Sequence, residues 1–204
     1  MLDLLDLPKD QFTSNTFTTG ATASSLLGIA LARDDVVGRI QARRGRCGAT
    51  GGPWQVGEDG TDGVEVEVIV AGAHASVAKV ASLLGLGRRA VLDMSTGPCR
   101  VDFDLAELET RLKANKEESK GSVVALAYGE VNTGGFTSQT KLVRELCDRY
   151  DAWLHIDAAF GAFAVLLPDW RHLAQEMALA DSITSDAHKC ERSTTWGVFF
   201  CVTR

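Results

Sequence analysis

Hydrophobic side chains along this 204-residue chain alternate between the spacing of helices and the spacing of strands. Residues 22–33 are rich in Ala and Leu and follow the small-residue sequence TTG at 18–20, which predicts a helix entered through a tight turn. In residues 64–71, valines alternate with glutamates and then give way to an apolar run, which predicts a strand with one face in water. Helix and strand signals therefore follow one another early in the chain.

The rest of the chain repeats this alternation. Ser76 is expected to cap a helix that ends near Gly85, and Asp104-Leu-Ala-Glu107 has the pattern of a capping box that opens another helix. The sequence Val123-Val-Ala-Leu-Ala-Tyr128 is a continuous apolar run, typical of a strand buried on both faces. The other predicted elements are a helix over 139–150, with Leu142, Val143, Leu146 and Tyr150 on one face, and strands over 153–157, near 181–185 and over 197–202.

Alternating elements of this kind predict an α/β fold with a mostly parallel sheet flanked by helices. The length suits one larger domain over residues 1–204. Residues 43–63 hold many glycines and a proline, and they lack the Lys-Ser/Thr ending of a nucleotide-binding loop. We therefore expect an exposed Gly-rich loop over 43–63.

Composition narrows the class of protein. Hydrophobic residues make up 45% of the chain, charged residues 24%, and the net charge is −6, which fits a globular protein and argues against a nucleic-acid partner. The five cysteines form no CxxC pair, which favours free thiols in a reducing compartment and hence a cytoplasmic protein. We expect no signal peptide, no membrane span and no metal site.

Polar residues that follow the strands are the candidates for chemistry, because ligands of an open α/β sheet bind beyond the carboxyl ends of its strands. Asp157 ends an apolar strand and precedes two alanines, so its carboxylate either caps a turn or holds a protonated ring nitrogen. Lys189 taken alone is an ordinary surface charge. Other residues in such positions are His74, Glu130, Asn132 and His188.

Two further features are compatible with a flat, anionic ligand. His74 lies at a strand-to-helix junction, where its ring either stacks on a planar ligand or satisfies a turn carbonyl. Gly20-Ala21-Thr22 stands at a predicted helix N-terminus and offers N–H groups and a hydroxyl to an anion, although many helices begin this way without binding one.

Taken in order, these motifs resemble the group II pyridoxal-phosphate decarboxylases, which include the aromatic-L-amino-acid, tyrosine and glutamate decarboxylases. The resemblance covers residues 13–189 and rests on four motifs. They are Phe17-Thr-Thr-Gly-Ala-Thr-Ala-Ser-Ser25 for the phosphate-cradling turn, Ala73-His-Ala-Ser76 for the ring-stacking histidine, Trp153-Leu-His-Ile-Asp-Ala-Ala159 for the pyridinium-partner strand, and Asp186-Ala-His-Lys189 for the Schiff-base segment.

The resemblance implies a fold-type I large domain that binds pyridoxal 5′-phosphate. It implies that Lys189 carries the cofactor as a Schiff base, that Asp157 pairs with the ring nitrogen, and that His74 stacks over the ring while Ala159 packs beneath. The residues implied to hold the phosphate are Ala21, Thr22 and His188, with Asp186. The implied activity is decarboxylation of an L-amino acid, with an aromatic substrate favoured by family frequency, in a homodimer.

The chain also departs from the family. Members are longer, so we expect this chain to lack their dimer-completing N-terminal segment, their small C-terminal domain, and the mobile loop whose tyrosine donates a proton. Cys190-Glu-Arg-Ser193 replaces the aromatic residue and proline usual after the lysine, and Ser25 replaces a common Asn. Two alternatives stay open: a truncated, catalytically impaired paralogue that partners a full-length decarboxylase, and another pyridoxal-phosphate enzyme of this fold, such as an aldolase or desulfurase.

Overall fold

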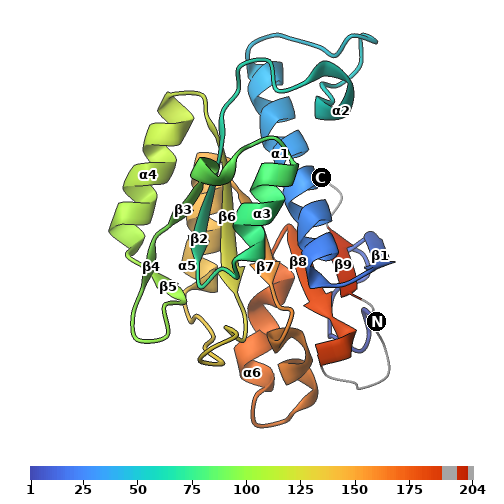
Figure 1. Ribbon diagram of the computed structural model, residues 1–204, viewed down its shortest axis with the longest axis vertical. Helices are drawn as coiled ribbons and strands as arrows, with labels where there is room; N and C mark the ends of the chain where they lie inside the picture. The colour runs from blue at the N-terminus through green and yellow to red at the C-terminus, as the bar shows by residue number, and fades with distance from the viewer. Residues whose placement is uncertain (190–196, 202–204) are drawn as a thin grey trace.

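Seven strands form the central sheet of the computed structural model, which describes residues 1–189 and 197–201 (Figure 1). Their order is β1-β9-β8-β7-β6-β2-β3. The strands are β1 (Ser14–Thr18), β2 (Val66–Ala71), β3 (Val91–Asp93), β6 (Gly121–Ala127), β7 (Trp153–Asp157), β8 (Ser182–Asp186) and β9 (Gly197–Cys201). From β3 to β8 neighbouring strands are parallel, whereas β9 runs antiparallel to both β8 and β1. The predicted mostly parallel sheet is confirmed.

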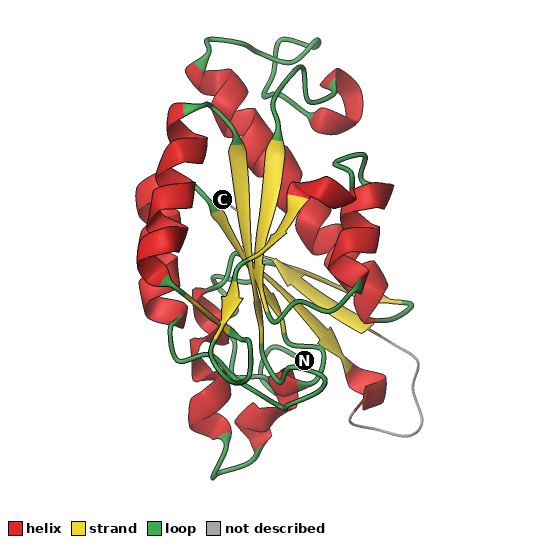
Figure 2. Cartoon of the chain, turned by 60° about the vertical axis from the view of Figure 1, so that its left-hand side comes forward, coloured by secondary structure: helices red, strands yellow, loops and turns green. Residues whose placement is uncertain are grey.

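Helices cover both faces of this sheet (Figure 2). The helices are α1 (Ala21–Arg43), α2 (Val56–Asp59), α3 (Ser76–Leu83), α4 (Leu105–Glu117), α5 (Thr140–Tyr150) and α6 (Arg171–Ala174). Shorter 3₁₀ turns are η1 (Arg88–Ala90), η2 (Gly161–Leu166), η3 (Gln175–Leu179) and η4 (Ala187–Lys189), and β4 (Ser95–Thr96) pairs with β5 (Asp102–Phe103) outside the main sheet. Among the described residues, no helix combines the length and apolar content needed to cross a lipid bilayer.

The alternation of side chains along β2 shows how the two cores form. Val66, Val68 and Val70 pack with buried residues of α1 and α3, whereas Ile69 and Ala71 belong to the core beneath α4 and α5. Because successive side chains of a strand point to opposite faces, an apolar strand can serve both cores at once. The parallel strands β2, β6, β7 and β8 therefore have their carboxyl ends at one edge of a sheet that is buried on both sides.

Some helix predictions need correction. α1 continues to Arg43, ten residues beyond the predicted end, because Val36, Val37 and Ile40 prolong its buried face after a charged stretch. Ser76 does not cap α3 but is its first residue, since its hydroxyl bonds to a neighbouring side chain instead. In α5 Leu142 is 48% exposed, because the buried face runs through Thr140, Val143, Leu146 and Cys147.

The strand predictions hold better. β6 and β7 lie where expected, and all seven residues of β6 are buried. The prediction that one side of β2 faces water is wrong, because α4 covers that side. Glu67 accepts hydrogen bonds there from Arg111 Nε at 2.7 Å and from Asn115 Nδ2 at 2.9 Å. The edge strands β1 and β3 were not predicted. Residues 190–193 and 202 lie outside the described part of the chain.

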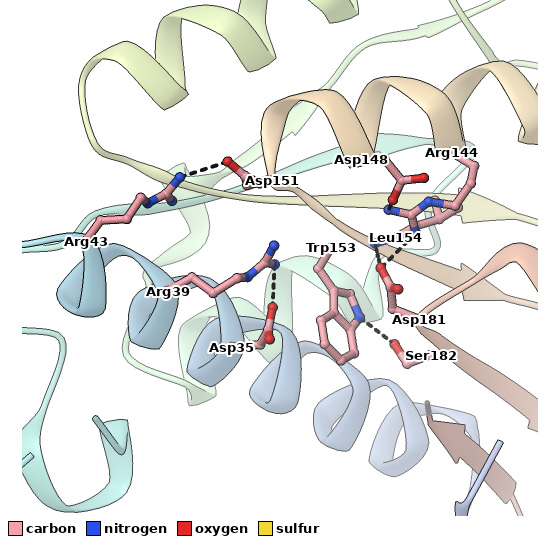
Figure 3. Close-up of polar contacts among 10 residues, drawn as sticks. All are labelled: Asp35, Arg39, Arg43, Arg144, Asp148, Asp151, Trp153, Leu154, Asp181 and Ser182. Atoms are coloured by element: carbon pink, nitrogen blue, oxygen red, sulfur yellow. Dashed lines mark hydrogen bonds and ion pairs between the residues drawn. The ribbon is translucent and has the colours of Figure 1, made fainter. Parts of the chain in front are cut away.

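The amino end of β8 is held by a buried ion pair (Figure 3). Arg144 Nη1 lies 2.9 Å from Asp181 Oδ2, and the side chains are only 12% and 5% exposed. The same Asp181 oxygen accepts the Leu154 N–H at 2.7 Å, which links the pair to β7. Ser182, the residue after Asp181, accepts a hydrogen bond from the Trp153 indole at its Oγ, at 2.9 Å. β8, the strand that leads to Lys189, is thus fixed to α5 and β7 by polar contacts.

Candidate cofactor site

A pocket lies at the carboxyl edge of the sheet. Its wall comes from the segments that follow β2, β6, β7 and β8 and from the first turn of α1. The lining residues are Ala21, Thr22, Gly72, His74, Ser76, Ala127, Tyr128, Gly129, Glu130, Val131, Asp157, Ala159, Phe160 and Lys189. Six of the eight predicted site residues are in this set, and the structure therefore brings together residues that are far apart in sequence.

β9 places the N-terminus of α1 beside the lysine segment. Gly197 pairs with Thr18 at the end of β1 and with Asp186 at the end of β8. A Cβ on Gly197 would lie 2.4 Å from the Gly20 carbonyl carbon, so only glycine permits this approach. Gly20 itself has a φ of 136°, a backbone conformation that favours glycine, and it begins α1 without a side-chain cap. The first turn of α1 therefore keeps N–H groups that face a shared hollow.

Asp186 and His188, the remaining two predicted residues, lie in an adjoining hollow that also contains Gly20, Ala21, Thr22 and Lys189. Asp186 is 2% exposed, and its Oδ2 accepts the Ala21 N–H at 3.2 Å. Its Oδ1 lies 2.9 Å from Nδ1 of the exposed His188. The Asp186 carboxylate thus orients the His188 imidazole and the N-terminus of α1. Both groups are suited to bind a further anion besides Asp186 itself.

Asp157 stands at the end of β7, half-buried in the pocket wall. Its Oδ1 accepts the Ala159 N–H at 3.1 Å, which is the turn contact that the sequence left open. Within the described residues no hydrogen bond reaches Oδ2. Burial raises the pKa of Asp157 above its ordinary value, although the Ala159 N–H, Lys189 and His74 act in the opposite direction. A cationic partner in the pocket would stabilise the ionised form of this partly buried carboxylate.

His74 is exposed at the pocket rim, between β2 and α3. The Ser76 N–H donates to its Nδ1 at 3.2 Å, and Ser76 Oγ lies 2.9 Å from the same nitrogen. Since Nδ1 accepts a hydrogen bond, the neutral ring carries its proton on Nε2. These contacts fix the plane of the ring without involving its faces.

Lys189 ends the pocket at η4. Its Nζ lies 3.9 Å from the centroid of the Phe160 ring, and within the described residues no carboxylate lies within ion-pair distance of it. Phe160 was not singled out from the sequence, although its position directly after Asp157-Ala-Ala159 was a usable signal. Ala159 is 6% exposed and lines the same pocket.

These features fit pyridoxal 5′-phosphate. Among the described residues, the Lys189 amine has no carboxylate partner and Asp157 Oδ2 has no donor, which suits the aldehyde and the ring nitrogen of that cofactor, respectively. The N-terminus of α1 suits its phosphate. Lys189, Asp157 and the Ala21-Thr22 turn line the same pocket, so one small molecule is able to contact all three.

Comparisons with known proteins also point to pyridoxal-dependent decarboxylases. A family profile described as "Pyridoxal-dependent decarboxylase conserved domain" matches residues 1–194. The L-2,4-diaminobutyrate decarboxylase of Acinetobacter baumannii is 31% identical over 180 residues, which cover 86% of this chain and 34% of that protein. The aromatic-L-amino-acid decarboxylase of Cavia porcellus is 27% identical over 176 residues, covering 83% of this chain and 32% of the relative.

Solved structures share the fold. The glutamate decarboxylase domain of diaminobutyrate-pyruvate transaminase and L-2,4-diaminobutyrate decarboxylase from Vibrio parahaemolyticus has a TM-score of 0.78 at 23% identity, and 98% of this chain matches 41% of that one. Mouse CSAD in its apo form has a TM-score of 0.76 at 20% identity and covers 99% of this chain and 39% of its own. The chain spans about a third of the length of the curated relatives it matches over most of its own length.

The resemblance drawn from the four motifs is therefore confirmed. Because the family profile matches nearly the whole chain, the protein belongs to the pyridoxal-dependent decarboxylase family, whose cofactor is pyridoxal 5′-phosphate.

Proposed function

We propose that this chain binds pyridoxal 5′-phosphate through Lys189 and serves in the decarboxylation of an L-amino acid. The observation that carries the proposal is the arrangement of the pocket, where Lys189, Asp157 and the first turn of α1 line one cavity. Bound pyridoxal phosphate supplies an electron sink for the electron pair released when carbon dioxide leaves the amino acid.

The residues of the chain have separate tasks in this proposal. Lys189 provides the amine that attaches the cofactor, and Asp157 keeps a proton on the ring nitrogen by offering a carboxylate in a partly dehydrated wall. The α1 N-terminus and His188, oriented by Asp186, hold the phosphate. The ring of His74, fixed by Ser76, covers one face of the site.

Cofactor binding is tested by visible absorbance. The purified chain mixed with pyridoxal phosphate should gain the absorption band of a lysine-bound cofactor, and Lys189→Ala should abolish it. Lys79→Ala, on the exposed surface of α3, is the matched control and should keep the band. A band that survives in Lys189→Ala would refute the assignment of the lysine.

The reaction is tested by carbon dioxide release from a panel of amino acids. Release that depends on Lys189 supports decarboxylation, and a different product from the loaded protein would favour another reaction of the fold. A chain that binds the cofactor but is silent across the panel would favour the catalytically impaired paralogue. The aromatic side chain expected from family frequency remains a prediction that the panel addresses.

A homodimer in the cytoplasm is also part of the proposal. Exposed large apolar side chains support self-association, since an interface between two copies would remove apolar surface from water. The most exposed among the described residues are Phe17, Leu83, Leu167 and Trp170, at 60%, 64%, 54% and 53%. Size-exclusion chromatography with light scattering tests the assembly, and a clean monomer at micromolar concentration would contradict it.

A further inference from the structure

Glu130 is an ionisable residue of the pocket that the proposed cofactor contacts leave unused. It lies three residues after the end of β6, in a turn entered through Gly129 at a φ of 71°. A Cβ at position 129 would lie 2.9 Å from the Gly161 backbone nitrogen, so this turn is pressed against the segment after β7. Glu130 therefore has a defined place between the ends of β6 and β7, with its side chain in the pocket lining.

Hydrogen bonds hold the Glu130 carboxylate in one orientation. Oε2 accepts the N–H groups of Asn132 and Thr133 at 3.0 and 2.9 Å and lies 2.9 Å from the Thr133 hydroxyl. Oε1 accepts the Asn132 side-chain amide at 2.8 Å, which leaves it capacity for another donor. A carboxylate held in this way is preorganised rather than free to turn into solvent.

The Glu130 carboxylate keeps its negative charge, and this charge has no counter-ion among the described residues. Burial alone would raise the pKa of Glu130, but the hydrogen bonds from Thr133 and Asn132 outweigh it and lower the pKa. All its donors are neutral, and in the part of the chain that the structure describes no Lys, Arg or His forms an ion pair with it. The adjoining hollow adds Asp93 and Arg100, which pair with each other at 3.0 Å.

We infer that Glu130 binds a cationic group on the substrate's side chain, so that the site takes α-amino acids with a second ammonium group in preference to neutral or acidic ones. This inference rests on the proposed function. With Asp157 and Lys189 committed to the cofactor, Glu130 supplies the remaining fixed charge among the described residues that line the pocket, and that charge is negative. It attracts an ammonium and repels a side-chain carboxylate, and a charge-assisted hydrogen bond is stronger than a neutral one.

Glu130 could instead have a purely structural role, in holding the 130–133 turn. A substitution that removes its charge distinguishes this role from substrate binding. Glu130→Gln keeps one oxygen that accepts the Asn132 and Thr133 N–H groups and loses only the contact with the Asn132 side-chain amide, so the turn should persist. Glu145→Gln, on the exposed surface of α5, is the matched control for loss of one negative charge. The probes are 2,4-diaminobutyrate, its uncharged isostere norvaline, and glutamate, each titrated into the pyridoxal-phosphate-loaded chain while cofactor absorbance is followed.

The wild-type chain should bind diaminobutyrate at least about tenfold more tightly than norvaline, and glutamate most weakly. Glu130→Gln should bind diaminobutyrate about tenfold more weakly than the wild type, norvaline within about twofold of the wild type, and glutamate more tightly. Glu145→Gln should bind all three as the wild type does. Equal losses for diaminobutyrate and norvaline would assign Glu130 a structural role and overturn the inference. So would a wild-type chain that does not distinguish the two. Absence of any cofactor band in the wild type would instead show that the proposed function has failed, and the inference with it.

Discussion

Removing Arg144 from its buried ion pair with Asp181 should destabilise this domain by an unusually large amount. Arg144→Met keeps most of the side-chain volume but removes the guanidinium that lies 2.9 Å from Asp181 Oδ2 (Figure 3). The carboxylate is 5% exposed and retains the Leu154 N–H as a donor, so its charge stays inside the protein without the Arg144 cation. Breaking one partner of a buried pair costs about 3–5 kcal/mol.

For a chain of this length, that loss corresponds to a fall in Tm of roughly 6–20 °C. The assay is urea and thermal unfolding followed by circular dichroism. The control is Arg43→Met, because Arg43 Nη1 also lies 2.8 Å from an aspartate, Asp151, but the two side chains are 50% and 33% exposed. We expect the control to lose less than about 1 kcal/mol, since solvent screens an exposed pair.

A double variant refines the reasoning. Asp181→Asn in the Arg144→Met background removes the buried charge but keeps an oxygen for the Leu154 N–H, so it should recover part of the lost stability. If Arg144→Met costs no more than Arg43→Met, burial is not the factor that sets the value of this pair, and the argument fails.

Three other changes have defined outcomes. Gly28→Ala would place a Cβ 2.6 Å from His155 Cε1 and should cost about 1–3 kcal/mol in urea unfolding. Gly38→Ala, whose Cβ meets its nearest neighbour at 3.4 Å, should be neutral or stabilising, and equal effects at the two positions would refute the steric argument. Burial lowers the pKa of His155 to about 4 from 6.5. The unfolded chain therefore binds the extra proton first, and stability present above pH 6.5 is lost as the pH falls towards 4. Between pH 7 and pH 5 the wild type should lose about 2 kcal/mol more than His155→Gln, and parallel losses would contradict this. Phe160→Leu removes the ring that Lys189 Nζ contacts at 3.9 Å, so the lysine should take up pyridoxal phosphate about two- to fivefold faster in stopped-flow absorbance. An unchanged rate would show that the ring does not restrain the amine.

The central strands were predictable because their physical signal is local. A continuous apolar run such as that of β6 has no stable place except between two covering layers, and Asp157 is conspicuous because it interrupts such a run. β1 was not predictable in this way. All but one of its five residues are exposed, and it is a strand only because β9 pairs with it.

Contacts distant in sequence account for the other differences. Glu67 reads as a solvent-facing residue because neither Arg111 nor Asn115 is near it along the chain, yet both cover it from α4. The candidate site shows the same limit. The resemblance implies that Asp186 helps to hold a phosphate group, and this stays a prediction; its contacts with Ala21 and His188 had no local signal in the sequence. Pairing of this kind depends on how β9 joins β1 to β8.

The position of β9 also bears on how the domain is made. The turn before α1 is translated long before Gly197, the residue that pairs with both Thr18 and the end of β8. Contacts between such distant segments form slowly, because a long loop has to close before any of them is gained. A nascent chain can thus complete the parallel strands β2, β6, β7 and β8 while the Gly20-Ala21-Thr22 turn is still separate from Lys189. If the proposed function holds, cofactor capture should follow the docking of β9.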